Sequence, residues 1–193
     1  MIDVSHVSKR FGAVVALADV NLRIQNGERV AFVGSNGSGK TTLLRSLLGL
    51  LRVEGEIRIS GVDVAKAPEL ALRKVAYIPQ VAPPLDASVE EVMRAHASLR
   101  GITVTSIAER VARLQLSTVA IAKARFRDLS GGMRQKLLAA LALASDAQIL
   151  ICDEPTANLD NGARAAFFEE LAGLPPDRIV IVCSHRFEEV DGL

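Results

Sequence analysis

A glycine-rich segment that ends in a lysine and a threonine is the part of the chain best suited to chemistry. The run from Gly34 to Thr41 reads GSNGSGKT and matches the pattern G-x-x-x-x-G-K-[ST] at every fixed position. Glycines let successive backbone N–H groups turn toward a phosphate at a helix N-terminus, which favours negative charge. Lys40 would then contact the β- and γ-phosphates, and the Thr41 hydroxyl would bind Mg²⁺. The segment predicts a site for a nucleoside triphosphate with Mg²⁺.

The sequence on either side supplies the elements that such a loop requires. Residues 28–33 read ERVAFV, as a buried strand would, and residues 42–48 read TLLRSLL, as an amphipathic helix would begin. The alternative is a glycine-rich turn with a chance lysine. Such a turn would not need a strand before it and a helix after it, so the order of these elements favours a phosphate loop. The residues expected to bind nucleotide here are Gly34, Ser35, Asn36, Gly37, Ser38, Gly39, Lys40, Thr41 and Thr42.

Two adjacent acids follow another apolar run. Residues 149–152 read ILIC, and Asp153 and Glu154 come directly after them. Side chains at the carboxyl end of a parallel strand face the ligand crevice. Asp153 is therefore expected to hold Mg²⁺ through water, and Glu154 to polarise the water that attacks the γ-phosphate. Alone, the pair could equally be a solvated strand end, but downstream of a phosphate loop it is much more specific.

A second helix start also suits an anion. Ser130 is a good N-cap residue, and Gly131 and Gly132 leave the backbone bare at the start of a predicted helix. In isolation the segment is better explained as an ordinary capped helix. Together with the phosphate loop, it gives the chain two phosphate-receptive helix ends.

Short apolar runs alternate with helical patterns along most of the chain, which favours an α/β fold. Buried parallel strands are predicted at residues 30–33, 75–78, 148–152 and 178–183, and strands with one solvated face at 22–24 and 56–59. Helices are predicted at residues 40–50, 68–74, 88–99, 106–114, 131–144 and 162–171. Only helical patterns occur between about Val81 and Asp128. We expect one domain, in which 1–80 and 129–193 form the core and 81–128 an inserted helical subdomain.

The composition is that of a compact protein with an apolar core. Of the 193 residues, 49% are hydrophobic and 23% are charged, which argues against long disorder. A net charge of +1 gives no electrostatic case for binding nucleic acid. Residues 137–151 are too few to span a bilayer, and the N-terminus lacks the order of a secretory signal. Cys152 and Cys183 lie in apolar runs, so we expect reduced, buried cysteines in a cytosolic chain.

Six signals follow one another in the order found in ABC-type ATPases. They are the phosphate loop, Gln80 after a strand, LSGG at 129–132, Asp153-Glu154, ANLD at 157–160, and Ser184-His185. The chain resembles the nucleotide-binding domain of an ABC transporter over nearly its whole length, from Ile2 to about Val190. The resemblance implies a P-loop NTPase core with three layers and a mainly parallel sheet. It also implies an N-terminal antiparallel β subdomain beside the helical insertion.

The resemblance implies roles for further residues. Phe11 falls where the family stacks an aromatic ring on adenine, although a phenylalanine is more often buried in a strand. Gln80 resembles the glutamine that touches Mg²⁺ and the attacking water. His185 resembles the histidine that contacts the γ-phosphate, where a plain surface histidine is the alternative. Asp160 resembles a loop acid that communicates across a dimer. The resulting catalytic set is Lys40, Gln80, Glu154 and His185, and the Mg²⁺ set is Thr41, Gln80 and Asp153.

The resemblance also implies partners. Two copies pack head to tail in this family, so Ser130, Gly131 and Gly132 of one copy would close over the ATP held by Lys40 of the other. A separate transmembrane permease would dock near Gln80 and the helical subdomain. The chain would then be cytoplasmic and peripheral to the inner face of the plasma membrane. Hydrolysis of the shared ATP would let the dimer open.

Two departures from the family pattern stand out. Met133 occupies the position of the usual signature glutamine, but Ser130 and both glycines remain, so ATP sandwiching is expected to survive. Relatives generally continue further beyond His185, so a naturally short subunit, a trimmed chain and a disrupted product all stay open.

The segment 133–136, MRQK, resembles exporter ATPases more than nutrient importers.

Two rival functions fit the sequence less well. A non-transport ABC ATPase would act on ribosomes or DNA, but the chain has one phosphate loop, no heptad run and no basic face. A GTPase or nucleotide kinase would share only the phosphate loop, and the signature at 129–132 argues against it. The transported substrate is not predicted.

Overall fold

The structure is a computed structural model, which describes residues 1–185. Its strands are β1 (Ile2–Phe11), β2 (Val14–Ile24), β3 (Arg29–Val33), β4 (Glu54–Ile59), β5 (Val62–Asp63), β6 (Val75–Ile78), β7 (Ile149–Asp153) and β8 (Ile179–Ser184). Its α-helices are α1 (Lys40–Leu47), α2 (Pro68–Leu72), α3 (Val89–Arg100), α4 (Val104–Arg113), α5 (Thr118–Ile121), α6 (Gly131–Ala144) and α7 (Asn161–Ala172).

The chain forms two compact units. Within the described residues, the first unit comprises 1–77, 147–153 and 175–185, and the second comprises 78–146 and 154–174. All strands except the last residue of β6 belong to the first unit, which also contains α1 and α2. The helices α3 to α7 belong to the second unit.

The N-terminal sheet of the first unit is antiparallel, with the strand order β2-β1-β4-β5. Register shifts interrupt β1 around His6, a residue other than glycine at φ 53°. Beside this irregularity β4 comes so close that a Cβ on Gly55 would lie 2.3 Å from the His6 carbonyl oxygen, so glycine is required. Because such bulges break the alternation of buried and exposed residues, the sequence pattern reveals only the last three residues of β2.

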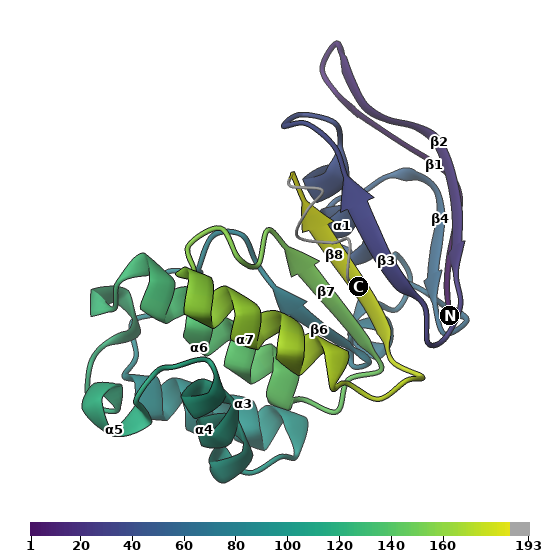
Figure 1. Cartoon of the computed structure of the whole chain (residues 1–193). Coiled ribbons are helices and arrows are strands. Elements are labelled where there is room, and N and C mark those ends of the chain that lie inside the picture. The colour runs from purple at the N-terminus through teal and green to yellow at the C-terminus, as the bar shows by residue number, and fades with distance from the viewer. Residues whose placement is uncertain (186–193) are drawn as a thin grey trace. The chain divides into compact units, whose positions relative to one another are not determined.

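The second sheet of the first unit has the strand order β3-β8-β7-β6, and β8 runs parallel to β3 and β7 (Figure 1). Every residue of β7 and β8 is buried, as is typical of parallel strands. Helix α1 contributes Leu43, Leu44 and Leu47 to a core that also contains Ile2 of β1 and Ile181 of β8. The same helix therefore packs against residues of both sheets, and this holds its N-terminal end in a fixed place within the unit.

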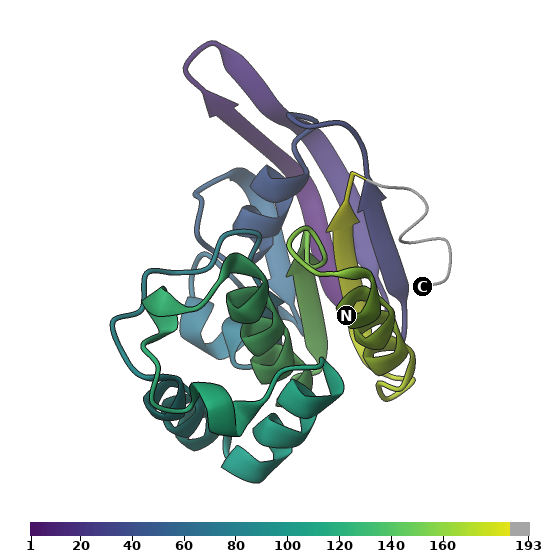
Figure 2. The ribbon, with the colours of Figure 1, turned by 60° about the vertical axis from the view of Figure 1, so that its left-hand side comes forward.

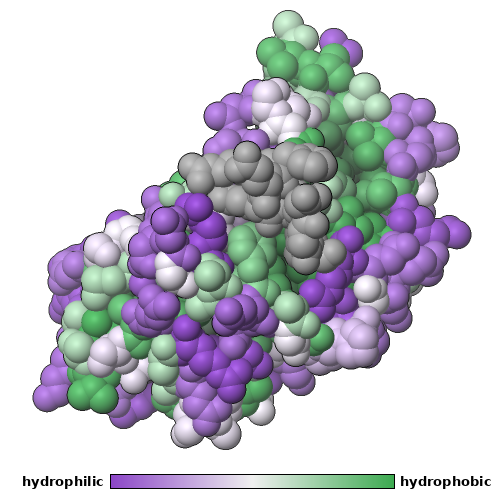
Figure 3. Space-filling model, viewed as in Figure 1, coloured by the Kyte–Doolittle hydropathy of each residue, from purple (hydrophilic) through white to green (hydrophobic). Residues whose placement is uncertain are grey.

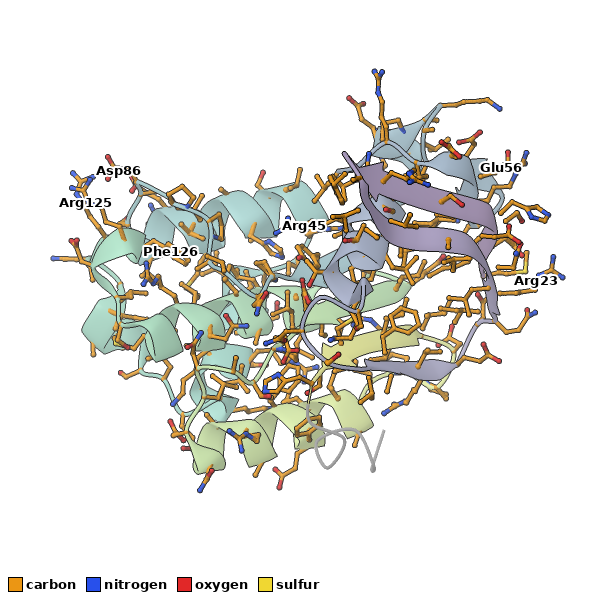
Figure 4. The ribbon with its side chains drawn as sticks, turned by 90° about the horizontal axis from the view of Figure 1, so that it is seen from above. Arg23, Arg45, Glu56, Asp86, Arg125 and Phe126 are labelled. Carbon is orange, nitrogen blue, oxygen red and sulfur yellow. The ribbon has the colours of Figure 1, made fainter. Side chains whose placement is uncertain are left out.

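Helices α3, α4, α5 and α6 gather in the second unit (Figure 2). Met93 of α3, Ile107 of α4 and Leu137 of α6 are buried, as is Phe126 in a short 3₁₀ helix at Phe126–Asp128. Just before this 3₁₀ helix, Arg125 pairs with Asp86, with 2.7 Å between Nη1 and Oδ1 (Figure 4). Residues 81–128, which the structure describes in full, contain helices and a single isolated β-bridge, as the sequence predicts.

The α/β class and the antiparallel N-terminal sheet are confirmed, but some helix boundaries were wrong. Helix α1 ends three residues before the predicted Leu50, because Gly49 turns the chain at φ 66°. Helix α4 begins at Val104, two residues before the predicted Ser106, because the Thr103 side chain caps it. The short helix α5 was not predicted, since four residues are too few for a periodic pattern.

Two further predictions concern the membrane and the cysteines. Among residues 1–185, no helix combines the length and the apolar character needed to cross a membrane. Cys152 and Cys183 are buried thiols that take part in no disulfide among the described residues, as predicted. Burial raises the pKa of the Cys152 thiol far above its usual range, which keeps it protonated and unreactive.

Candidate nucleotide-binding site

The phosphate loop follows β3 and ends at the first residue of α1. Gly39 is the N-cap of α1 at φ 93°, and a Cβ there would lie 2.6 Å from the carbonyl oxygen of Ala16. Gly37 also lies in the left-handed region, at φ 83°. No side chain caps α1, and its first turn contains no acid. The N–H groups at this helix start are thus left to an external acceptor, and the helix dipole favours an anion there.

Lys40 extends back over the loop that precedes it. Its ammonium donates to the carbonyl oxygens of Gly34, at 2.6 Å, and Ser35, at 3.1 Å. An ammonium has three donors, so these contacts orient the charge over the loop without using all of its donors. A lysine held in this way can meet a phosphate as a point charge.

Thr41 and Asp153 lie together although they are 112 positions apart in the sequence. The Thr41 hydroxyl donates to Oδ1 of Asp153 across 3.3 Å, and Asp153 is buried. A hydroxyl and a carboxylate are oxygen ligands of the kind Mg²⁺ prefers, and Mg²⁺ in proteins is often held by one or two carboxylates plus substrate phosphates. The pair therefore fits a Mg²⁺ that accompanies a bound nucleotide. Among the described residues there is no group of three or more His, Cys, Asp or Glu that could hold a metal alone.

The carboxyl ends of three neighbouring strands meet at one edge of the parallel sheet. In the register of the sheet, Val33 of β3 pairs with Ser184 of β8, and Asp153 of β7 pairs with Cys183. The phosphate loop starts immediately after Val33, and His185 follows Ser184 as an exposed residue. The structure thus brings His185 to the sheet edge that carries the phosphate loop and Asp153, as an α/β fold requires of ligand-binding residues.

Phe11 lies at the end of β1, in the hairpin that β1 forms with β2. Its side chain is 49% exposed, and the neighbouring Val14 and Val15 are exposed as well; Figure 3 shows hydrophobic residues at the tip of this hairpin. The Lys9 ammonium lies 5.2 Å from the centre of the Phe11 ring. The exposed ring excludes the alternative of a buried core residue and leaves a face available for stacking.

Ser130 and the two glycines after it lie in the second unit. Ser130 is the N-cap of α6, and its Oγ accepts the N–H of Met133 across 3.2 Å. A Cβ on Gly132 would lie 2.8 Å from the carbonyl oxygen of Asn158, so Gly132 allows a close approach of the loop at 157–160. A Cβ on Gly131 would meet nothing within 4 Å. Gly131 is therefore the more open of the two glycines, and Gly132 has a packing reason of its own.

Gln80 and Glu154 also belong to the second unit. Gln80 is exposed in a bend after β6, while Glu154 is only 8% exposed. Glu154 has φ 48°, a left-handed backbone conformation that costs a residue other than glycine about 1–3 kcal/mol. Such strain is often found at functional sites, where the surrounding structure holds it in place.

Asp160 has a local role that the sequence analysis did not assign to it. It is the N-cap of α7, accepts the N–H of Ala163 at 2.9 Å, and pairs with the ammonium of Lys136 on α6 at 2.9 Å. The N–H of Ala163 and then Lys136 hold the pKa of the Asp160 carboxyl below its usual range. Asp160 directly precedes the helix, and aspartate is a preferred N-cap residue, so the sequence did contain a signal for this role.

Gln135 is the residue that the sequence analysis passed over. Its side chain is 2% exposed, and its Nε2 donates to the carbonyl oxygens of Pro79, at 3.4 Å, and Pro155, at 3.1 Å. Gln135 lies on a helix face with the buried Ala139 and Ala142. A polar residue at an apolar position of a helix was the signal that could have revealed it.

A phosphate loop between a strand and a helix, with an acid at the carboxyl end of another strand of the same sheet, defines a P-loop nucleotide-binding protein. Within that class, the family described as "ABC transporter" matches residues 17–157. The chain belongs to this family, as an ABC-type ATPase domain that binds ATP. The resemblance drawn from the motifs of the sequence is confirmed.

The relatives are ATP-binding subunits. The chain is 36% identical over 200 residues to the Nod factor export ATP-binding protein I of Cupriavidus metallidurans, covering 100% of this chain and 65% of that protein. It is 34% identical over 198 residues to the energy-coupling factor transporter ATP-binding protein EcfA1 of Thermotoga maritima, covering 100% of this chain and 75% of the relative. The chain thus spans less than two thirds of the length of the Cupriavidus protein.

The fold is shared with solved cassettes. The dimeric structure of MJ0796, a bacterial ABC transporter cassette, superposes with a TM-score of 0.85 at 27% identity, covering 100% of this chain and 91% of that one. A second dimeric structure of the same cassette, in a post-hydrolysis state bound to ADP and Pi, gives a TM-score of 0.85 at 26% identity.

Proposed function

We propose that this chain is the ATP-hydrolysing subunit of an ABC transporter, which dimerises around two Mg-ATP and drives a separate membrane permease. The observation that carries the proposal is the joint arrangement of Lys40 over the phosphate loop and Thr41 beside Asp153. It supports binding of the triphosphate and its Mg²⁺ at the same end of α1.

The proposal assigns separate roles in ATP binding and hydrolysis to the residues of the site. Backbone N–H groups of the loop and the Lys40 ammonium bind and orient the phosphates. Thr41 and Asp153, with Gln80, would hold Mg²⁺, which neutralises charge on the β- and γ-phosphate oxygens when bound. Glu154 accepts a hydrogen bond from the attacking water and polarises it, and His185 contacts the γ-phosphate. Phe11 would stack on the adenine ring.

Dimerisation is part of the proposal. The open start of α6, at Ser130 and Gly131, is suited to the γ-phosphate of an ATP bound by a second copy. Dimeric structures of a related cassette support this arrangement. Loss of the γ-phosphate would remove a group shared by both copies and release them, as in other nucleotide switches.

The proposal also includes a direction of transport. The first relative takes part in Nod factor export by its name, and the segment 133–136 resembles exporter ATPases, so we propose an exporter. A permease would dock near Gln80 and the helices of 81–128, and would hold the chain at the cytoplasmic face of the membrane. A non-transport ABC ATPase is the second candidate, but the names of the relatives, which include an energy-coupling factor transporter, favour transport.

Release of phosphate from Mg-ATP tests the proposed activity. Removing a general base typically costs about 10²- to 10⁴-fold in rate, so Glu154→Gln is expected to lose that much of kcat while ATP still binds. Glu169→Gln makes the same change at an exposed position of α7 and is the matched control. An unchanged kcat in Glu154→Gln would remove this residue from catalysis, and a wild-type chain that hydrolyses no ATP in the presence of Mg²⁺ would refute the proposed activity.

A further inference from the structure

Gln135 connects two loops that carry proposed catalytic residues. One of its hydrogen bonds ends on the carbonyl of Pro79, the residue before Gln80, and the other on the carbonyl of Pro155, the residue after Glu154. Gln135 lies 56 positions from Pro79 and 20 positions from Pro155 in the sequence. All of these residues belong to the second unit.

The chemistry of the side chain fits this position closely. A primary amide has two N–H donors on one nitrogen, and each of the two neighbouring carbonyls accepts one of them. The oxygen end of the amide could not take this place, because it would face two other acceptors. With Gln135 2% exposed, loss of the donors would leave two carbonyls without these partners, which is costly in a buried place.

The backbone at Glu154 gives an independent reason for such a contact. Glu154 lies at φ 48° and directly precedes Pro155, whereas the residue before a proline prefers an extended conformation. A strained residue of this kind persists only when its surroundings hold it. The N–H of Ala157 donates to the Glu154 carbonyl across 3.3 Å, and Gln135 holds the next carbonyl in the chain.

We propose that Gln135 is a positioning residue, which sets the backbone on which Glu154 and Gln80 present their side chains to the attacking water. The inference rests on the proposed function, because it acts through those two residues. Gln135 also lies in the second turn of α6, the helix that Ser130 caps.

Steady-state hydrolysis of Mg-ATP by the full chain tests this role with Gln135→Met, which keeps the length of the side chain and removes both donors. A small misplacement of a catalytic group can cost on the order of 100-fold in rate, so we expect kcat to fall about 10- to 100-fold. KM should stay within about twofold, since no ATP contact is lost. Gln148→Met, at an exposed position before β7, should leave both constants unchanged.

A double variant separates positioning from simple loss of stability. If Gln135 acts mainly through Glu154, then Gln135→Met in the Glu154→Gln background should lower the residual kcat by less than about twofold, since the two changes are not additive. Gln135→Glu, of the same shape but without the donors when ionised, should behave like Gln135→Met in kcat.

The outcomes are distinguishable. Wild-type kcat in Gln135→Met, in a chain that Glu154→Gln inactivates, would overturn this inference alone. Full activity of Glu154→Gln would overturn both this inference and the proposed function. Additive losses in the double variant, or failure of both Gln135 variants to fold, would assign Gln135 to stability and overturn its positioning role.

Discussion

Helices α1 and α6 both begin without an acid in the first turn, but their N-termini are built differently. Helix α1 begins after Gly39, which offers no side-chain cap, and a lysine ammonium lies over the loop in front of it. Helix α6 begins after Ser130, whose Oγ already accepts the N–H of Met133. A hydroxyl that accepts one hydrogen bond can still donate its own hydrogen.

The difference suggests a division of work between the two helix ends. The α1 end has a cation, bare N–H groups and a hydroxyl–carboxylate pair within one unit, so it can bind a triphosphate by itself. The α6 end has a hydroxyl donor and an open Gly131. We infer that the α1 end determines the affinity for ATP and that the α6 end completes the site from a second copy.

The largest effect is expected at Lys40. Hydrogen bonds to charged groups typically contribute about 1.5–3 kcal/mol, so Lys40→Ala should weaken ATP binding about 10- to 100-fold. Calorimetric titration of the purified chain with ATP measures the Kd. Lys123→Ala, at an exposed site in the second unit, is the control. An unchanged Kd in Lys40→Ala would mean that the α1 end does not determine affinity.

A smaller effect separates the cap of α6 from its proposed ligand role. Ser130→Ala and Thr103→Ala each remove an N-cap of similar geometry, with 3.2 Å from Ser130 Oγ to Met133 N and 3.1 Å from Thr103 Oγ1 to Ser106 N. Each should lower the free energy of unfolding by about 1 kcal/mol, measured by urea denaturation. Only Ser130→Ala should also weaken ATP-dependent dimerisation. Equal ATP-dependent dimerisation of the two variants would show that Ser130 only caps α6 and has no role in the dimer.

The smallest effect concerns α7. Its N-cap residue is an acid, Asp160, whereas the N-cap residues of α1 and α6 are Gly39 and Ser130. The pKa of Asp160 is held below its usual 3.8 by the N–H of Ala163 and by Lys136. Its contribution to stability is therefore present above pH 3.8 and is lost as the pH falls through the lower folded-state pKa. In the Asp160→Asn variant, the free energy of unfolding should fall less between pH 7 and pH 3 than it does in the wild type. Urea denaturation at pH 7, 4 and 3 measures this difference. An identical pH dependence would show that the carboxylate contributes nothing there.

The parts of the fold that sequence predicts best are those with local signals. The phosphate loop needs only eight consecutive residues, and β7 and β8 are continuous apolar runs. Strand β1 was not predicted, because register shifts around His6 disturb its alternation. The hydrogen bond between Thr41 and Asp153 joins residues 112 positions apart. The contacts of Gln135 likewise depend on three distant segments, and no local pattern specifies such contacts.

The mass in solution of the Glu154→Gln variant, measured with and without ATP in the absence of Mg²⁺, shows whether two copies share an ATP site. We expect a monomer without nucleotide and a dimer with ATP, because ATP bound at α1 of one copy would be completed by α6 of the other. Adding Ser130→Arg to the same variant should keep ATP binding and abolish the dimer, whereas Ser98→Arg, at an exposed position of α3, should not. A chain that binds ATP and stays monomeric, or a dimer that tolerates Ser130→Arg, would contradict the shared site.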